Sequence, residues 1–320
     1  MKRTFLLLFT MLSCLFFVSC GDEPEVTKKE SQDNQQEQKQ NDDQKPDDGG
    51  TKTDTPEEVK IENGTIKSAF SVSSTQKVYF STGNLQYQAS AGTWQFAENQ
   101  YDVIGKDNSN ISSTNAAFID LFGWGTSGWE NGVEAFQPYS TEYDYAKYYV
   151  GGSSENNLVG SYANADWGVY NSISNGGGKA GMWRTLTAEE WYYVIKDRKN
   201  AYDLYSVAKV NGVNGLILLP DNWTTPSSIE FTPSAYSWAT NVYTTDEWEV
   251  FEKAGAVFLP AGGYRSGSSV SDVNAYGAYW STTGSSSNAY CVWFNSANVS
   301  PKYGLSRDNG AAVRLVTDVQ

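Results

Sequence analysis

The sequence contains no histidine among its 320 residues, and this absence limits the chemistry it could perform. Serine or cysteine nucleophiles that depend on histidine are excluded, as are metal sites that need imidazole ligands. The formal net charge of −14 and the pI of about 4.5 argue against nucleic acid as a partner, because such binding depends on neutralising phosphates. The remaining candidates for chemistry are carboxylates, thiols and aromatic side chains.

Two pairs of adjacent carboxylates could act as an acid and a base: Glu189 with Glu190, and Asp246 with Glu247. Each pair follows a threonine at the start of a predicted helix, where carboxylates stabilise the positive end of the helix dipole. Helix capping explains both pairs without catalysis. The oxygen-rich run 107–110 lacks the glycine and closing glutamate of a helix-loop-helix calcium site, and a solvated loop explains it better. We predict no catalytic residue, no metal and no cofactor.

Cys20 ends a segment with the layout of a lipoprotein signal. Lys2 and Arg3 precede an apolar run at 5–18, which is too short for a comfortable membrane span. Residues 17–20 resemble a lipoprotein box, in which the cysteine thiol takes the lipid after cleavage. An ordinary secretory signal with an incidental cysteine is the alternative. We predict a signal peptide at 1–19 and a lipid anchor on Cys20 that attaches the protein to a membrane.

The segment after Cys20 is acidic and has no aromatic residue. Residues 21–58 carry 13 Asp and Glu against 5 Lys and Arg, so they cannot bury enough apolar surface to offset the entropy lost on ordering. We predict a disordered tether over 20–58, kept extended by its like charges. Its first residues, Gly21, Asp22 and Glu23, resemble the signal that directs Bacteroidetes lipoproteins to the outer face of the outer membrane. This resemblance implies an outer-membrane, cell-surface location.

Residues 59–320 contain all 11 tryptophans and all 21 tyrosines, and no second low-complexity stretch interrupts them. We therefore predict one domain. Its single cysteine, Cys291, cannot form a disulfide within the domain, so the core must depend on packing of the aromatic side chains. Apolar runs separated by Gly, Asn and Ser predict short strands, at 76–81, 215–219, 256–259, 289–294 and 311–316.

Two helices are predicted by capping boxes, in which a threonine precedes a glutamate by three residues. Thr187 and Glu190 begin a helix expected to reach about Asn200. Thr244 and Glu247 begin a second one, for which Gly255 has the position of a C-terminal stop. The predicted fold class is α+β, loop-rich, with two main helices and several short strands.

Several segments, in this order along the chain, resemble one family of domains. The clearest are 183–191 (WRTLTAEEW), 258–265 (FLPAGGYR) and a C-terminal block over 277–316; weaker ones lie at 78–87, 120–126 and 166–171. They are similar to blocks shared by formylglycine-generating (sulfatase-modifying factor) domains and the major paralogous domain of Fibrobacter and Bacteroidetes. The resemblance covers about 66–317 and implies a C-type lectin-like fold in its sulfatase-modifying-factor variant, with short antiparallel strands.

The same resemblance bears on catalysis, because this family includes an oxidase that needs a reactive cysteine pair or thiolate-bound copper. The domain offers only Cys291, in an alternating apolar run that is typical of a strand. Arg184 and Arg314 match family positions, which implies structural ion pairs. We therefore expect that the protein is not an enzyme. A degenerate formylglycine-generating-type enzyme is the third hypothesis.

Residues 276–309 are rich in Tyr, Trp, Ser, Asn and Gly, a composition typical of adaptable binding surfaces. We assign Trp280, Trp293 and Phe294 to the core. Residues 276–314 resemble the block rewritten in variable proteins of diversity-generating retroelements, although an unmutated paralogue is equally consistent with them. The predicted ligand-binding residues are Tyr276, Tyr279, Ser285, Ser286, Ser287, Asn288, Tyr290, Asn298, Tyr303, Ser306, Arg307 and Asn309.

The first functional hypothesis is a surface-tethered receptor or adhesin whose C-terminal loops bind a macromolecule. Under this hypothesis, alanine at Tyr279, Tyr290 and Tyr303 should abolish ligand capture with little change in thermal unfolding. The second hypothesis is a glycan-binding component of a polysaccharide-uptake system, in which exposed aromatic rings stack on sugars.

Overall fold

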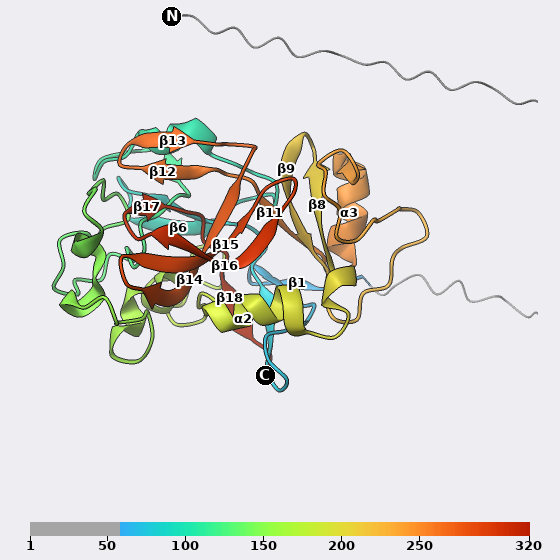
Figure 1. Ribbon diagram of the computed structural model, residues 1–320, viewed down its shortest axis with the longest axis horizontal. Helices are drawn as coiled ribbons and strands as arrows, with labels where there is room; N and C mark the ends of the chain where they lie inside the picture. Colours follow the sequence, from blue (N-terminus) through green and yellow to red (C-terminus); the bar gives the residue numbers. More distant parts are fainter. Residues whose placement is uncertain (1–57) are drawn as a thin grey trace, which may run out of the picture. The chain divides into compact units, whose positions relative to one another are not determined.

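The computed structural model describes residues 58–320, shown in colour in Figure 1. The predicted signal peptide (1–19), the lipid anchor at Cys20 and all but the last residue of the predicted tether lie outside these residues. Within 58–320 no helix is both long and apolar enough to cross a membrane. The fold is mixed, with many short strands and few helices, which agrees with the α+β prediction.

Both predicted capping boxes are present. The Thr187 hydroxyl accepts a hydrogen bond from the backbone N–H of Glu190, whose carboxylate accepts one from the backbone N–H of Thr187. Thr244 and Glu247 repeat this exchange. These reciprocal bonds satisfy amide donors that a helix start leaves unpaired. The three α-helices of the described residues are α1 (Trp167–Tyr170), α2 (Ala188–Tyr192) and α3 (Thr245–Lys253).

The two main helices end differently. α3 stops as predicted, because Gly255 has a φ of 90° and the amides of Gly255 and Ala256 bond back to the last turn. α2 is shorter than predicted and passes into a π-helical turn at Tyr193–Asp197. The buried Arg198 ends that turn, since its guanidinium donates to the carbonyl oxygen of Val194 at 2.7 Å and pairs with a carboxylate.

The strands within residues 58–320 form six small sheets. Strand pairs within them are antiparallel, except that β10 runs parallel to β8. The sheets comprise β1 (Ile61–Glu62) and β2 (Thr65–Ile66); β10 (Val242–Tyr243), β8 (Tyr205–Val210), β9 (Val213–Leu218) and β11 (Val257–Pro260); β13 (Ser269–Ser271), β12 (Tyr264–Ser266) and β17 (Asn309–Gly310); β14 (Gly277–Ser285), β15 (Asn288–Phe294) and β16 (Val299–Ser306); β18 (Val316–Asp318), β4 (Lys77–Phe80) and β3 (Phe70–Ser71); and β6 (Thr93–Phe96), β5 (Leu85–Gln88) and β7 (Phe118–Ile119).

Four of the five predicted strands correspond to β4, β9, β11 and β15. The fifth, at 311–316, is wrong for most of its length. Ala311 and Ala312 make only isolated bridges, and Val316 alone belongs to a strand. The segment crosses between sheets, and every residue in it is buried against one of them. Its apolar composition therefore reflects burial and not strand pairing.

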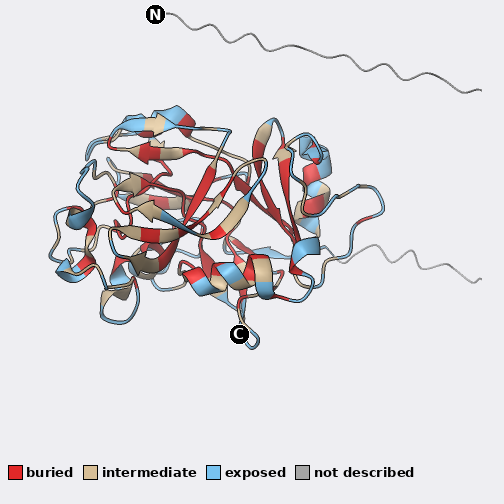
Figure 2. Ribbon diagram, viewed as in Figure 1, coloured by how far each residue is buried: buried red, intermediate tan, exposed pale blue. Residues whose placement is uncertain are grey.

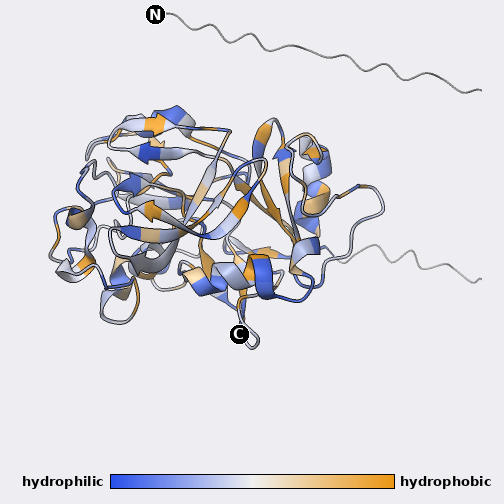
Figure 3. Ribbon diagram, in the orientation of Figure 1, coloured by the Kyte–Doolittle hydropathy of each residue, from blue (hydrophilic) through white to orange (hydrophobic). Residues whose placement is uncertain are grey.

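α3 packs against the sheet that contains β8, β9 and β11. Trp248 and Phe251 of the helix join Phe258 of β11 in one buried cluster. Figure 3 shows hydrophobic residues on β8 and β9 beside α3. The turn between these strands contains Asn211 and Gly212, both at positive φ, as a two-residue hairpin requires.

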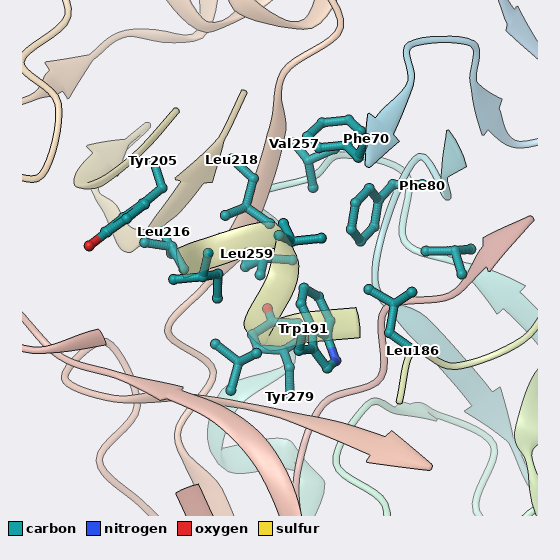
Figure 4. Packing of buried hydrophobic residues seen from close by; sticks show 14 of the residues in the cluster. Phe70, Phe80, Leu186, Trp191, Tyr205, Leu216, Leu218, Val257, Leu259 and Tyr279 are labelled. Atoms are coloured by element: carbon teal, nitrogen blue, oxygen red, sulfur yellow. The ribbon is translucent and has the colours of Figure 1, made fainter. Parts of the chain in front are cut away.

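Within the β14–β15–β16 sheet, the first part of β14 and much of β15 are buried on both faces, whereas β16 is mostly partly exposed (Figure 2). Tyr279 and Val292 belong to one core cluster, and Figure 4 shows Tyr279 beside Trp191 of α2. Trp280 and Cys291, one position away on their strands, belong to a second core cluster. Alternate side chains of each strand thus enter two different cores, which fixes the sheet firmly within the domain.

Candidate ligand-binding groove

A groove opens between the β12–β13–β17 sheet and one end of the β14–β15–β16 sheet. Its volume is about 390 Å³. We call it the aromatic groove, because four of its lining residues are Tyr or Trp. The lining residues are Gly263, Tyr264, Asp272, Tyr276, Ala278, Trp293, Tyr303, Leu305 and Asn309.

Three aromatic rings form a row along this groove. The ring centroids of Tyr276 and Trp293 lie 4.8 Å apart with planes at 30°, and those of Trp293 and Tyr303 lie 5.2 Å apart at 26°. Trp293 is only partly buried and Tyr303 is 42% exposed, so the row borders solvent. Stacked rings restrain one another, and together they present apolar faces and edges with polar tips.

Strand register explains how these rings meet. Trp293 lies opposite Ala278 of β14, whose small side chain leaves room for the indole. On β16, Trp293 pairs with Ser300 while Cys291 pairs with Tyr303, so β16 has an extra residue at this point. Such a bulge re-aims the side chains that follow it, and here it accompanies the contact between Tyr303 and Trp293.

The loop from β13 to β14 supplies the polar side of the groove. Asp272 and Asn274 have φ values of 58° and 64°, in the left-handed region that most residues avoid. Asn274 is held there by the backbone N–H of Asn214, which donates to its side-chain oxygen at 2.6 Å. Gly263 packs so closely on this loop that a Cβ would lie 2.2 Å from the carbonyl oxygen of Ser271. The loop therefore has little freedom to change its path.

The structure brings only part of the predicted set together. Tyr276, Tyr303 and Asn309 line the aromatic groove. The β14–β15 turn lies at the other end of the β14–β15 ladder, where Ser285 pairs with Asn288. Strands rise about 3.3 Å per residue, which puts the turn some 25 Å from the Tyr276 end of β14. The predicted residues that line no part of the groove but retain some exposure are Ser285, Ser286, Ser287, Asn288, Tyr290, Asn298 and Ser306.

Two predicted ligand-binding residues, Tyr279 and Arg307, are completely buried, and for them the prediction is wrong. The Tyr279 hydroxyl donates to the carbonyl oxygen of Pro260 at 2.9 Å and accepts from the Asn84 side chain at 3.0 Å. The Arg307 guanidinium carbon lies 4.3 Å from the ring centroid of Trp124, and burial lowers the pKa of Arg307 to about 10. Both side chains stabilise the fold and cannot touch a ligand in this structure.

Six of the lining residues are absent from the predicted ligand-binding set, among them Trp293, Tyr264 and Asp272. Trp293 was assigned to the core, because it lies in an apolar run, but it forms the centre of the aromatic row. Tyr264 and Asp272 precede the C-terminal block and enter the groove only through the packing of two sheets. Asp272 and Asn274 mark this segment as a polar loop, but such residues are common in loops and single out no site.

The groups considered for chemistry have structural partners. Cys291 is completely buried, and burial raises the pKa of its thiol well above the ordinary range, which disfavours the reactive thiolate. Glu190 caps α2 and forms an ion pair with Arg184 at 2.8 Å. The structural ion pair expected for Arg184 is therefore present. The expectation for Arg314 is wrong: its buried guanidinium binds Gln100, Asn84 and a backbone carbonyl, and no carboxylate.

The oxygen-rich run at 107–110 is also structural. It lies largely in a 3₁₀ turn (Gly105–Ser109), in which Asn108 is completely buried. The Asn108 oxygen accepts from the backbone amides of Asp120 and Leu121, and its NH₂ group donates to the Asp120 carboxylate at 2.7 Å. This amide is therefore committed to positioning Asp120.

Two carboxylates, Asp120 and Asp166, are buried without an ion pair. Burial raises the pKa of each to about 6, against the lowering effect of hydrogen bonds from Asn108 to Asp120 and from Thr185 to Asp166. Neither residue lines the aromatic groove. A raised pKa often marks a catalytic acid, but here the Asp120 carboxylate accepts from the backbone amide of Ile104, and the Asp166 carboxylate accepts from those of Gly168 and Thr185.

We expect Asp166→Asn to change how stability depends on pH. The folded protein holds the Asp166 proton up to about pH 6, whereas the unfolded chain loses it near pH 4. In the wild type, the stability gained from the raised pKa of Asp166 is therefore fully present below pH 4 and is lost as the pH rises through 6. Relative to wild type, the free energy of unfolding of the variant should rise by about 1–3 kcal/mol between pH 4 and 7. Urea titrations over this range measure it, with the exposed Asp203→Asn as control, and parallel wild-type and variant profiles would contradict it.

Comparison of the chain with protein-family models, with curated proteins and with solved structures gives no match.

Proposed function

We propose that the protein is a ligand-binding lipoprotein of the cell surface, a receptor or adhesin, that captures its ligand in the aromatic groove. The row of Tyr276, Trp293 and Tyr303 at the solvent border carries this proposal. Tyr and Trp give large, rigid contact areas at low cost in conformational entropy, and they dominate the binding energy of many interfaces. Anchoring through a lipid on Cys20 in the outer membrane is part of the proposal.

The proposal extends to the fold. We propose a C-type lectin-like fold in its sulfatase-modifying-factor variant, supported by the two capped helices and the C-terminal three-stranded sheet. A C-terminal block diversified by a retroelement and an unmutated paralogue are both consistent with the sequence, and the surroundings of the gene distinguish them. A reverse transcriptase and a near-copy of the 3′ end beside the gene would support diversification, and their absence would oppose it.

The groove itself is tested by substituting the two outer rings. We expect Tyr276→Ala with Tyr303→Ala to weaken ligand capture by about a hundredfold, because rings of this kind are worth roughly 1–2 kcal/mol each at a binding site. Binding of the chain from residue 21 onward to cell surfaces and to a glycan array, measured by titration, gives the affinity. Thermal unfolding should change little, since both rings border solvent.

Tyr236→Ala is the matched control, because Tyr236 is 77% exposed and lies outside the groove. It should leave capture unchanged. Equal capture by the wild type and the groove double variant would rule out the groove as the binding site.

A glycan-binding component of a polysaccharide-uptake system is the second candidate. The observation that favours it is the exposed Tyr303 ring on the edge strand β16, which lines the groove together with Asn309. Aromatic faces pack against the apolar faces of sugar rings, and amides bond to hydroxyl groups. Strong binding of a simple glycan on the array would favour this candidate, and binding to protein alone would favour the receptor.

A further inference from the structure

We infer that the part of the ligand that enters the aromatic groove carries a positive charge, as an alkylammonium or guanidinium group displayed by a polypeptide partner. This inference rests on the proposed function, because it requires the groove to be the binding site. It adds the chemistry of the partner: a lysine or arginine side chain.

The first observation is the carboxylate of Asp272. Asp272 is exposed and lines the groove beside the aromatic rings. Across residues 58–320, its side chain takes part in no ion pair and no hydrogen bond. Asp272 thus brings a full negative charge to the groove with no partner inside the described domain.

The second observation is that the nearby cationic side chains are committed elsewhere. Arg265 is completely buried and donates to the carbonyl oxygens of Gly267 and Leu121. Arg307 is buried between the rings of Trp124 and Tyr149. Lys302 pairs with Glu189 at 2.5 Å and lies over the Tyr192 ring. None of the three lines the groove.

The lining residues include no lysine or arginine, so the groove lacks a cation of its own. A ligand that covers the groove removes water from Asp272, and a carboxylate that loses water without gaining an opposite charge is unfavourable. A neutral ligand can offer it only hydroxyl or amide donors. An ammonium or guanidinium group offers charge-assisted hydrogen bonds and is also attracted to the faces of the surrounding rings.

The backbone of Asp272 allows a clean test of the charge. Its φ of 58° lies in the left-handed region, which both aspartate and asparagine tolerate. Asp272→Asn should therefore keep the fold unchanged while it removes the charge.

A pair of small probes tests the inference directly. N-acetyl-arginine methylamide and N-acetyl-citrulline methylamide have nearly the same shape, but only the first is charged. Their binding to the chain from residue 21 onward can be followed by NMR, through the indole N–H signal of Trp293, which is assigned by its loss in Trp293→Phe. We expect the arginine probe to bind about tenfold more tightly, an advantage that Asp272→Asn abolishes and higher salt reduces.

Asp203→Asn is the control, since it removes an exposed carboxylate outside the groove, and it should keep the preference. Equal binding of both probes, or a preference that survives Asp272→Asn, would overturn the inference. If a neutral methyl glycoside shifts the Trp293 signal more strongly than either probe, the inference fails while the groove remains the binding site. If no probe and no glycoside perturbs Trp293, and Tyr276→Ala with Tyr303→Ala also leaves cell-surface capture intact, the proposed function itself fails.

Discussion

Tyr279→Ala should destabilise the domain by about 3–5 kcal/mol, the range for removing a large aromatic side chain from a core. Tyr279 is completely buried on β14, and its ring stacks on Phe294 with centroids 6.1 Å apart. Its hydroxyl links the Pro260 carbonyl oxygen to the Asn84 side chain. The substitution therefore creates a cavity and leaves two polar groups without this partner. Urea denaturation at neutral pH measures the effect.

Tyr279→Phe separates the hydroxyl from the ring. It keeps the packing but leaves polar partners unpaired, so we expect a loss of about 1–2 kcal/mol. Tyr303→Ala, on the edge strand β16 of the same sheet, should cost less than about 0.5 kcal/mol, in keeping with its exposure. A Tyr279→Ala protein as stable as Tyr303→Ala would show that the ring is not part of the core.

Arg314→Ala should cause the second large loss, about 3–5 kcal/mol, because it removes a large buried side chain and leaves the neutral acceptors of the guanidinium without a donor. The Arg314 guanidinium donates to Gln100 at 2.6 Å, and more weakly to Asn84 and to the Phe258 carbonyl oxygen. It thereby joins segments that are distant in sequence, and burial lowers its pKa to about 10, so it remains charged at neutral pH. Chemical denaturation of wild type and variant gives the difference.

Arg184→Ala is an instructive comparison. Arg184 has two carboxylate partners, Glu190 and Asp318, but its side chain is partly exposed, so we expect a loss of only about 1 kcal/mol. The loss of stability for Arg314→Lys should lie between those for Arg184→Ala and Arg314→Ala. A lysine ammonium keeps the charge but cannot reproduce the several hydrogen bonds of the planar guanidinium. If Arg184→Ala lowered the free energy of unfolding more than Arg314→Ala, the partly exposed ion pairs of Arg184 would contribute more to stability than the buried hydrogen bonds of Arg314.

Local features of the fold were predictable where a short run of residues determines them. The capping boxes at Thr187 and Thr244, and the stop at Gly255, depend on bonds within a few residues, and the structure confirms all three. The π-helical turn after α2 was not predictable, because it depends on Arg198 meeting Asp221 and Leu204. These partners come from outside the helix.

Burial on the C-terminal sheet was harder to predict from the sequence. Successive residues of a strand point to opposite faces, so alternation of apolar and polar residues reveals an exposed face when one face meets solvent. It reveals none where both faces are buried. Tyr279 and Trp280 point to opposite faces and are both completely buried. Because Tyr is as common at binding surfaces as in cores, composition alone placed Tyr279 at the ligand.

The groove was only half predictable for a related reason. Tyr276 and Tyr303 lie in the C-terminal block that the sequence singled out, but Tyr264 comes from β12 of a neighbouring sheet and Asp272 from the loop after β13. Their meeting depends on how two sheets pack, which no spacing in the sequence encodes. Trp293 was missed because a half-buried tryptophan beside apolar neighbours has the same local pattern as a core residue.

The stacking of Trp293 between Tyr276 and Tyr303 has a consequence for how fast and how selectively a ligand is accepted. Rings that already restrict each other's rotamers have little torsional freedom left to lose on association. A ligand of matching shape would meet a preformed receptor surface, as in lock-and-key recognition, and its complex would be long-lived. A ligand that needs the rings to separate would first have to break their mutual contacts.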